Sequence, residues 1–486
     1  MICISVTPSS RQLAKVDIWN AANQCDMVEV CLDHLLKDPE IPDLIEGCSK
    51  PILLSCRRPQ DGGQWGGTEE ERLTLLRQAI VAGPAWVELE IDIANQIPRF
   101  GKTKRLISVT RLDKPLAGLE ASYERAIAAK ADAVKFTGPT PTLDAAWPLL
   151  AAVTKKRDIP VVGMGIGKPG LTFSLLGQKY GSPWIYAALE KGMESFEGQA
   201  TVSELDEIYR HRDFGPQTRL IGVSGFGQTS TTTLRVMNAG FALLNLNVRC
   251  LPLELDKLDS FAQMFDVLRI NAVLLDAQLG GRMISVVKSA EEPVKQSQFT
   301  DLLVKQADGW HAFNSVWRGA LKALEDRLGK TSPEDRPLDR RNVMLIGANA
   351  TARTIAYGVQ RRKGLISVTA ADDERAQLMA QMFEVRFVPL AQMYDTLCDV
   401  VIITEGSLDK GRHKQKLNPS YLRPSMTVMD VSNLPCETEL LEEARGRGCK
   451  VVEPQAIFAD QLRTQFKAIT GQDLPDEALQ AAASAT

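Results

Sequence analysis

The chain has 486 residues, 44% of them hydrophobic and 24% charged, which is enough for about two to four domains with sizeable cores. Its 57 basic and 60 acidic residues nearly cancel, and this balance argues against a nucleic acid or a membrane surface as the main partner. No apolar run reaches the roughly 18 residues of a membrane span. The nine cysteines include no Cys-x-x-Cys pair, so the sequence predicts neither a metal site nor a disulfide framework, and it favours the cytoplasm.

Residues 1–200 alternate short apolar runs with helical stretches. Helical patterns at 69–83 and 119–130 lie between some of these runs. Eight strands with helical connections favour a (β/α)8 barrel, in which chemistry takes place at the carboxyl ends of the strands. The eight runs that we expect to be strands are 1–6, 27–32, 51–56, 85–91, 105–110, 132–136, 159–165 and 182–189.

The remainder of the chain divides into a linker, two α/β lobes and a tail. Residues 201–218 are charged and contain Gly-Pro, so we expect a linker there, followed by a first lobe over 219–330. After a charged, proline-bearing break, residues 331–472 begin with a strand, a glycine turn and a helix, and they predict a parallel, doubly wound, Rossmann-like sheet. We expect the tail, 473–486, to be frayed.

The stretch "ADAVKF" places Lys135 in an apolar run near the end of a predicted barrel strand. Burying an unpaired ammonium is costly, so the site must pair this lysine, neutralise it or use it. A lysine that snorkels or is paired at the strand end is the purely structural alternative.

Several separated motifs resemble type I 3-dehydroquinate dehydratase in residues 1–200: "ADAVKF", "VEVCLDH", "SCRRPQDGG" and "SFEGQ". The resemblance implies that Lys135 forms a Schiff base with the substrate ketone, since an amine in an apolar barrel mouth is available as a nucleophile. It also implies a small anionic ring carboxylate, such as dehydroquinate, dehydroshikimate or shikimate, as the ligand. The substrate contacts it implies are Glu29, Asp33, Arg57, Asp61, Ser195 and Gln199.

The rest of the chain resembles shikimate dehydrogenase, and the order of the two halves resembles the fused proteins of plants. "STTTLRVMNAGF", "FNSVWRGAL" and "FADQLRTQF" carry this resemblance. It implies that 219–330 is a substrate lobe and that 331–472 binds NAD(P). The implied substrate contacts are Thr231, Thr233, Asn314 and Gln461, and the implied cofactor contacts are Gly347, Asn349 and Asp372.

The proton-transfer positions of both families are substituted. The acid–base histidine of the dehydratases falls on Thr110, and two of their arginines fall on Cys31 and Ser174. In the second half, "LLDAQLG" lacks the catalytic lysine, and Val316 replaces the catalytic aspartate. A threonine hydroxyl cannot shuttle a proton near pH 7. We therefore expect reduced or changed activity, and the alternatives are a ligand-binding pseudoenzyme or a different Schiff-base reaction on Lys135.

The nucleotide loop is altered as well. "GANATAR" keeps Gly347 but has side chains at Asn349 and Ala350, where backbone amides must approach a pyrophosphate. At the end of the next strand, Asp372 and Asp373 would repel the 2′-phosphate of NADP. No cofactor is therefore certain, and a dinucleotide bound here would be NAD rather than NADP.

Overall fold

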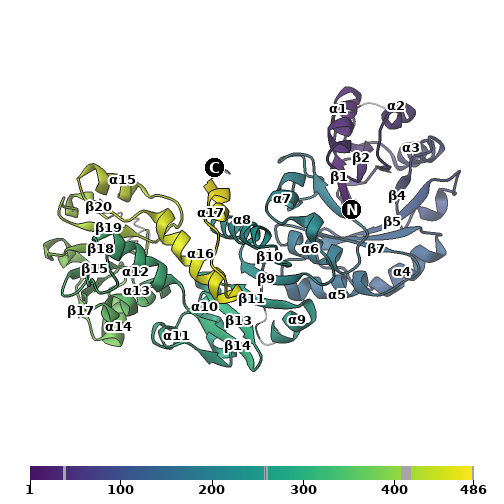
Figure 1. The fold of residues 1–486 in the computed structure, drawn as a ribbon. Helices are drawn as coiled ribbons and strands as arrows, with labels where there is room; N and C mark the ends of the chain where they lie inside the picture. Colours follow the sequence, from purple (N-terminus) through teal and green to yellow (C-terminus); the bar gives the residue numbers. More distant parts are fainter. Residues whose placement is uncertain (37–39, 257, 259–260, 407–416, 484–486) are drawn as a thin grey trace. The chain divides into compact units, whose positions relative to one another are not determined.

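A computed structural model describes residues 1–36, 40–256, 258, 261–406 and 417–483. The chain divides into two compact units (Figure 1). The first unit comprises Met1–Arg219 and Leu246–Lys257, and the second comprises Leu220–Asn245 and Leu258–Thr486.

The first unit contains a parallel eight-stranded sheet that curls into a nearly closed barrel. The strand order is β7-β6-β5-β4-β3-β2-β1-β8, and the edge strands β7 and β8 lie beside each other. The predicted barrel is confirmed. The eight strands are β1 (Ile2–Val6), β2 (Met27–Cys31), β3 (Ile52–Ser55), β4 (Trp86–Glu90), β5 (Lys104–Thr110), β6 (Ala133–Pro139), β7 (Val161–Ile166) and β8 (Ile185–Ala188).

Helices connect these strands, and local signals in the sequence set where several of them begin. In α3, for example, the Thr68 side chain accepts from the Glu71 amide while the Glu71 side chain accepts from the Thr68 amide, which is a capping box. The helices of the first unit are α1 (Arg11–Ala22), α2 (Ile41–Ile45), α3 (Glu69–Val81), α4 (Leu119–Ala128), α5 (Leu143–Thr154), α6 (Gly170–Lys179) and α7 (Val202–Glu207).

The first lobe of the second unit has a mixed sheet in which β9, β11, β13, β14 and β12 are neighbours in that order. The hairpin β13–β14 is antiparallel and was not foreseen from the sequence. The strands are β9 (Arg219–Ser224), β11 (Ile270–Leu274), β12 (Ser289–Ala290), β13 (Leu302–Gln306) and β14 (Gly309–Phe313). The helices are α8 (Gln228–Leu243), α9 (Phe261–Leu268), α10 (Ala277–Arg282), α11 (Glu292–Ser297) and α12 (Val316–Arg327).

The second lobe is the expected doubly wound sheet. All its strands are parallel, in the order β17-β16-β15-β18-β19-β20. This order reverses beside the first strand, as in dinucleotide-binding folds. The strands are β15 (Asn342–Ile346), β16 (Leu365–Thr369), β17 (Arg386–Phe387), β18 (Val400–Ile403), β19 (Thr427–Asp430) and β20 (Lys450–Val451).

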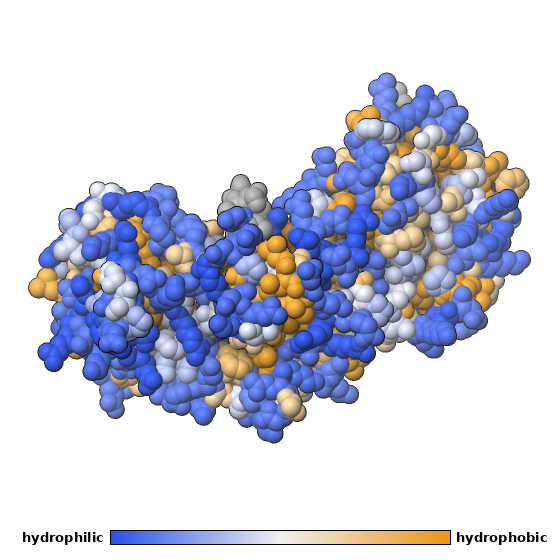
Figure 2. Space-filling view, viewed as in Figure 1, coloured by the Kyte–Doolittle hydropathy of each residue, from blue (hydrophilic) through white to orange (hydrophobic). Residues whose placement is uncertain are grey.

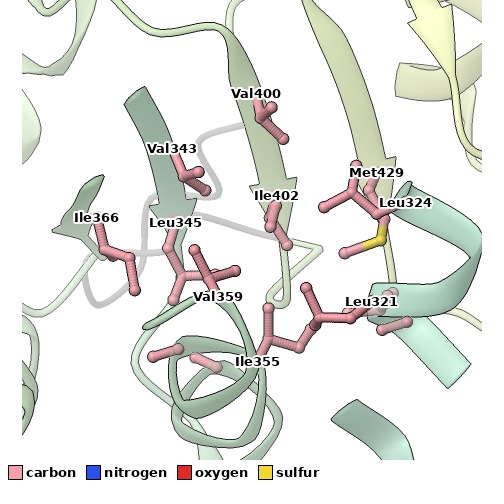
Figure 3. Packing of buried hydrophobic residues seen from close by; sticks show 14 of the residues in the cluster. Leu321, Leu324, Val343, Leu345, Ile355, Val359, Ile366, Val400, Ile402 and Met429 are labelled. Carbon is pink, nitrogen blue, oxygen red and sulfur yellow. The ribbon is translucent and has the colours of Figure 1, made fainter. Parts of the chain in front are cut away.

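Apolar side chains from both sides of this sheet hold the lobe together. Figure 3 shows Leu345 of β15 and Ile402 of β18 packed against Ile355 and Val359 of α13, with Leu321 of α12 beside them. The near-continuous apolar runs of the central strands are typical of a sheet that is covered on both faces. The helices here are α13 (Ala350–Arg361), α14 (Asp373–Phe383), α15 (Glu439–Gly446), α16 (Pro454–Thr470) and α17 (Asp476–Ala483).

Three segments differ from the expected organisation. The expected linker, 201–218, contains α7 and a short 3-10 helix (His211–Asp213) and belongs almost entirely to the first unit. Strand β10 (Val248–Leu253), expected in the substrate lobe, also clusters with the first unit, where Thr172 Oγ1 donates to Pro252 O at 2.7 Å. The expected frayed tail contains α17, which packs against α8, and its last residues, 484–486, lie outside the described part.

On the face drawn in Figure 2, hydrophilic residues predominate and apolar residues form smaller patches between them. Within the described residues, no helix combines the length and the apolar character that crossing a membrane requires.

Candidate functional site

Lys135 lies in the interior of the barrel and is paired. It follows the core residue Ala133 by two positions on β6, so both side chains point to the same face of the strand. Its side chain is 1% exposed, and Nζ donates to Glu88 Oε2 at 3.2 Å. The amine also lies 4.3 Å from the ring centroid of Tyr186 and 5.7 Å from that of Phe196. The structure therefore pairs this lysine with a carboxylate and covers it with two aromatic rings.

Glu88, on β4, is the partner that our sequence reasoning missed. Arg57 donates to both of its oxygens, from Nε to Oε1 at 3.2 Å and from Nη2 to Oε2 at 2.6 Å. Burial opposes ionisation, but Arg57 and Lys135 together hold the pKa of Glu88 well below its usual range. Its signal was present in "WVELE", where acids alternate with apolar residues on a buried strand.

Glu29 and Arg57 join this group, which we call the barrel cluster: Glu29, Arg57, Glu88 and Lys135. Arg57 Nη2 donates to Glu29 Oε1, and Ser5 Oγ donates to Glu29 Oε2 at 2.5 Å. All four charged side chains are at most 3% exposed. Two cations and two anions thus neutralise one another in the barrel interior, as buried charges require.

Asp33 and Asp61, the other predicted acids, have different partners. Asp33 accepts from the backbone amides of Arg57 at 3.0 Å and Gln64 at 2.8 Å, so it fixes the loop after β3. Asp61 accepts from Arg58 Nε at 2.6 Å. Both carboxylates hold the segment that carries Arg57, and no described contact links either of their side chains to Lys135.

The segment after β8 covers the barrel cluster. Ser195 donates to Gln199 Oε1 from its amide at 2.9 Å and from Oγ at 3.2 Å, while Gln199 Nε2 donates to Ser5 Oγ at 3.5 Å. Between them, Phe196 is 7% exposed, and its ring centroid lies 5.4 Å from Arg57 Cζ. Gly62, at φ 85°, leaves room for this ring, because a Cβ there would collide with it. The two predicted polar contacts therefore brace a cover whose apolar centre is Phe196.

The positions where the dehydratases carry their histidine and first arginine hold groups that cannot replace them. Cys31 is buried, and Arg57 Nη1 donates to its Sγ at 3.7 Å. Thr110 ends β5 and is half-buried. In the first 200 residues the only histidine is His34, whose Nε2 lies 3.7 Å from Asp33 Oδ2 and whose pKa is lowered by burial. The described contacts of the Lys135 amine include no histidine.

The second unit has a cavity of about 300 Å³, which we call the second-unit cavity. Its polar lining consists of five hydroxyl residues, two aspartates and two glutamines, and both Thr233 and Gln461 belong to it. Val316, at the position expected to have lost its acid, lines it too. Three positions inferred separately from the sequence therefore meet at one cavity.

Thr231 and Asn314 lie elsewhere. Residues 228–243 form α8, so the side chains of Thr231 and Thr233 point in different directions. Thr231 is half-buried and donates to Gly227 O at 3.1 Å. Asn314 is fully buried and donates from Nδ2 to Phe299 O and Thr354 Oγ1, both at 3.2 Å. Neither belongs to the cavity lining, because helix periodicity and core packing turn them away.

Asp301 is the acid of the second-unit cavity that the sequence reasoning missed. Its Oδ1 accepts from the Ser315 amide at 2.7 Å. Its Oδ2 accepts from Ser315 Oγ, from Gln461 Nε2 at 3.2 Å and from Gln465 Nε2 at 2.9 Å. Burial raises the pKa of Asp301, although these donors oppose the shift. The only signal in the sequence was a lone acid before the apolar run of β13.

The nucleotide loop is already satisfied by its own side chains. The Ala348 amide donates to Glu405 Oε1 at 3.2 Å, where a phosphate oxygen would need that donor. Asn349 caps α13 by accepting from the Ala352 amide at 2.8 Å and donates to Thr404 O at 2.8 Å. Gly347, at φ 120°, has no room for a Cβ because Thr404 packs against it. These contacts do not fit a bound pyrophosphate.

Asp372 also has a structural partner. Its Oδ1 accepts from the amides of Glu374 at 3.0 Å and Arg375 at 3.2 Å, so it caps α14. Beside this loop lies a cleft of about 540 Å³ lined by five acids, including Glu405, Asp430 and Glu437. Such a lining disfavours an anionic dinucleotide. Among the described side chains, no group of three or more potential ligands is arranged to hold a metal ion.

Comparison with known proteins gives this arrangement a family. A family model described as type I 3-dehydroquinase matches residues 2–215. A 3-dehydroquinate dehydratase of Dehalococcoides mccartyi is 30% identical, over 35% of this chain and 79% of that protein. The chain belongs to the type I 3-dehydroquinase family. The matched region ends close to the end of the first unit's main segment.

One relative is similar to nearly the whole chain. The bifunctional 3-dehydroquinate dehydratase/shikimate dehydrogenase of Arabidopsis thaliana, named as chloroplastic, is 25% identical over 98% of this chain and 83% of that protein. A shikimate dehydrogenase (NADP(+)) of Syntrophobacter fumaroxidans is 24% identical over 54% of this chain and 90% of its own length. The similarity to a bifunctional protein therefore extends over nearly the whole chain.

Solved structures are also similar to parts or nearly all of this chain. Shikimate dehydrogenase from Aquifex aeolicus covers 55% of this chain and 98% of its own, at 21% identity and a TM-score of 0.48. Dehydroquinate dehydratase and shikimate dehydrogenase from S. pombe covers 99% of this chain and 98% of its own, at 18% identity and a TM-score of 0.45.

Proposed function

We propose that the barrel is a Schiff-base site, in which Lys135 condenses with the ketone of 3-dehydroquinate or a related carbonyl compound. The observation that carries this proposal is the 3.2 Å contact between Lys135 Nζ and Glu88 Oε2 inside the barrel. When the site opens to admit the ligand, the ammonium releases a proton to water, the free amine attacks the carbonyl carbon, and loss of water leaves an iminium. The iminium draws electrons from the neighbouring C–H bond, which prepares that carbon for proton loss.

The steps after the iminium are slow or take a different course in this proposal. They need a group that removes the proton and returns it to the leaving hydroxyl. Thr110 has no accessible pKa for that task, and the pKa of Glu88 is held low, which makes its carboxylate a weak base. Loss of a positioned acid–base group typically slows a reaction by about 10²–10⁴-fold.

A ligand-binding protein without chemistry is the second candidate, and one observation favours it. Phe196 covers Lys135, and Arg57 is fully engaged by Glu29 and Glu88. The charges of the barrel cluster cancel beneath an aromatic ring, so the cluster can stabilise the fold even if it catalyses no reaction. In this second case the family's dehydroquinate or shikimate substrates act as ligands, and the cytoplasmic location remains a prediction in both cases.

The second unit keeps the dehydrogenase fold without hydride transfer. The missing lysine and Val316 remove the groups that would handle the alcohol proton. The bonds from Ala348 to Glu405 and from Asn349 to Thr404 occupy the donors and the space that a pyrophosphate needs. We therefore expect neither NAD nor NADP to bind tightly.

Reductive trapping tests the barrel proposal. The full chain is incubated with 3-dehydroquinate, treated with borohydride and measured by intact mass and peptide mapping. We expect one adduct at Lys135, none in Lys135→Met, and an unchanged adduct in Lys155→Met, whose lysine is exposed just after α5. Absence of the adduct at saturating ligand would refute the Schiff base and favour the ligand-binding candidate. Dehydratase turnover as fast as that of an enzyme with its acid–base histidine would refute our claim that this site lacks a proton-transfer group.

A further inference from the structure

The second-unit cavity has an unusual charge for a site expected to hold an anion. Asp276 and Asp301 both line it, and none of its described lining residues is lysine, arginine or histidine. Asp301 is 1% exposed, so its charge is poorly screened by water. A ligand carboxylate placed here would meet two aspartates and no side-chain cation.

Three of the five hydroxyl groups that line the cavity offer only acceptors to a ligand, whereas Ser224 Oγ accepts from the Asp276 amide at 2.7 Å and keeps its own hydrogen. Ser230 Oγ donates to Ser224 O at 2.8 Å, Thr229 Oγ1 donates to Leu434 O at 2.8 Å, and Thr233 Oγ1 donates to Thr229 O at 2.9 Å. Each of these three hydroxyls has only one hydrogen, and a backbone carbonyl already takes it. What remains for a ligand is their lone pairs, which call for a donor.

The two glutamines are turned the same way. A carboxylate accepts and does not donate, so Asp301 orients the amide nitrogens of Gln461 and Gln465 toward itself. Each amide then has its carbonyl oxygen and one remaining N–H for a ligand. Asp301 therefore sets the polarity of two further lining residues in addition to its own charge.

The start of α8 is the feature of the cavity that favours an anion, but the charges of Asp276 and Asp301 outweigh it. Gly227 caps this helix without a side chain, so the first amides of α8 carry a partial positive charge of about half a unit. The starts of α10 and α12 already have their own carboxylates, since Asp276 accepts from the Leu279 amide and Asp301 from the Ser315 amide. One partial charge faces two aspartates.

We infer that the second-unit cavity binds a small polyhydroxylated molecule that is uncharged or carries an ammonium group, and that it rejects the corresponding carboxylate. The cavity volume, about 300 Å³, is at the lower end of the roughly 300–1,000 Å³ typical of small-molecule sites, and suits one ring-sized ligand. Donor hydroxyls on such a ring would meet the glutamine oxygens, the serine and threonine lone pairs and Asp276. This inference concerns the second unit and does not depend on the chemistry of Lys135.

A matched pair of ligands tests it on the full chain. Shikimate and methyl shikimate share the ring and its hydroxyls and differ by the charge of one carboxylate. By titration calorimetry we expect methyl shikimate to bind at least about tenfold more tightly than shikimate. Val316→Phe, which fills the cavity from its wall, should abolish the binding of methyl shikimate and locates it to this unit.

Asp301→Asn removes the negative charge from this position of the second-unit cavity while keeping the shape of the side chain. The asparagine is uncharged, and the two glutamine amides are free to turn their nitrogens toward a ligand. We expect shikimate to gain about tenfold in affinity and the preference for the ester to shrink. The inference is overturned if shikimate binds the unaltered chain as tightly as its ester through a Val316→Phe-sensitive site. It is equally overturned if binding of the ester survives Val316→Phe, or if neither ligand saturates below about 20 mM. Failure of the Schiff base at Lys135 would leave each of these results unchanged.

Discussion

Glu88 in the first unit and Asp301 in the second are both buried carboxylates, and they respond to burial in opposite ways. Glu88 lies between Arg57 and Lys135, and its pKa is lowered. Asp301 accepts from a serine and two glutamines, all neutral, and its pKa is raised. Neutral donors do not repay the loss of hydration, whereas two cations do. The charge of a buried acid is therefore decided by its neighbours.

This difference separates the chemistry of the two units. In the barrel cluster the charges cancel, and Lys135 keeps Glu88 as a buried, ionised partner. In the second-unit cavity the negative charge has no side-chain counterion in the described lining, so it faces the ligand. The first unit has retained a nucleophile, and the second has become selective against anions.

Breaking the balance of the barrel cluster should have the largest effect. Arg57→Met leaves Glu29 and Glu88 with Lys135 as their single cation, and we expect a loss of about 3–5 kcal/mol in the free energy of unfolding. Urea denaturation of the full chain, followed at the first transition, measures it. The matched surface pair Lys155–Glu120 is 57% exposed on each side, and Lys155→Ala should change stability by less than about 1 kcal/mol. Equal losses in the two variants would contradict the comparison.

Glu90, two residues after Glu88, is a third buried carboxylate, and it should make the stability of the first unit depend on pH. Arg72 Nη1 donates to its Oε1 at 2.8 Å, but burial raises the pKa of Glu90 to about 7 from 4.5. Its stabilising contribution is therefore present below pH 4.5 and is lost as pH rises through about 7. Relative to Glu90→Gln, the natural chain should lose about 2 kcal/mol between pH 5 and 8. Amide hydrogen exchange in β4 and β5 at both pH values measures this, and a constant difference would exclude it.

Removing the aromatic ring of Phe196 should make the Lys135 amine more accessible to a ligand. Phe196→Ala exposes Lys135, and we expect adduct formation with 3-dehydroquinate and borohydride to become about tenfold faster, since the open form is no longer a minor population. Phe196→Leu, which keeps an apolar cover, should give an intermediate rate. A slower reaction in Phe196→Ala would show that this ring helps to hold the substrate.

The smallest effect is expected at the nucleotide loop. Glu405→Gln removes a charge from the Ala348 amide, and we expect NADP to bind about fivefold more tightly than in the natural chain. Calorimetric titration measures both affinities. Glu443→Gln, in the same acidic cleft but without a described bond to the loop, is the control. Tight NADP binding by the natural chain would instead show that the loop opens for phosphate.

Several of these features were predictable from local pattern. Eight apolar runs with helical connections predicted the barrel, and parallel apolar strands after a glycine turn predicted the doubly wound sheet. The apolar setting of Lys135 raised the question of its partner. Glu88 could have been found from the acids within "WVELE", since the residue types on a buried strand are visible in the sequence.

Other features depended on which segments meet. Thr231 and Thr233 look equivalent in the sequence, but α8 turns them to different faces and only Thr233 reaches the cavity. Asn349 and Asp372 looked available to a ligand, and each instead caps a helix. A polar residue does not reveal its partner until the fold places another group within about 3 Å.

The sequence by itself predicted the two folds and the residues at which we expect proton chemistry to be replaced, because strand and helix periodicity and residue identity are local properties. Only the tertiary structure decided that Lys135 is paired with Glu88, that Phe196 covers it, and that Asp301 faces a cavity without a described counterion. Those outcomes are electrostatic, and they depend on distances between side chains that are far apart along the chain.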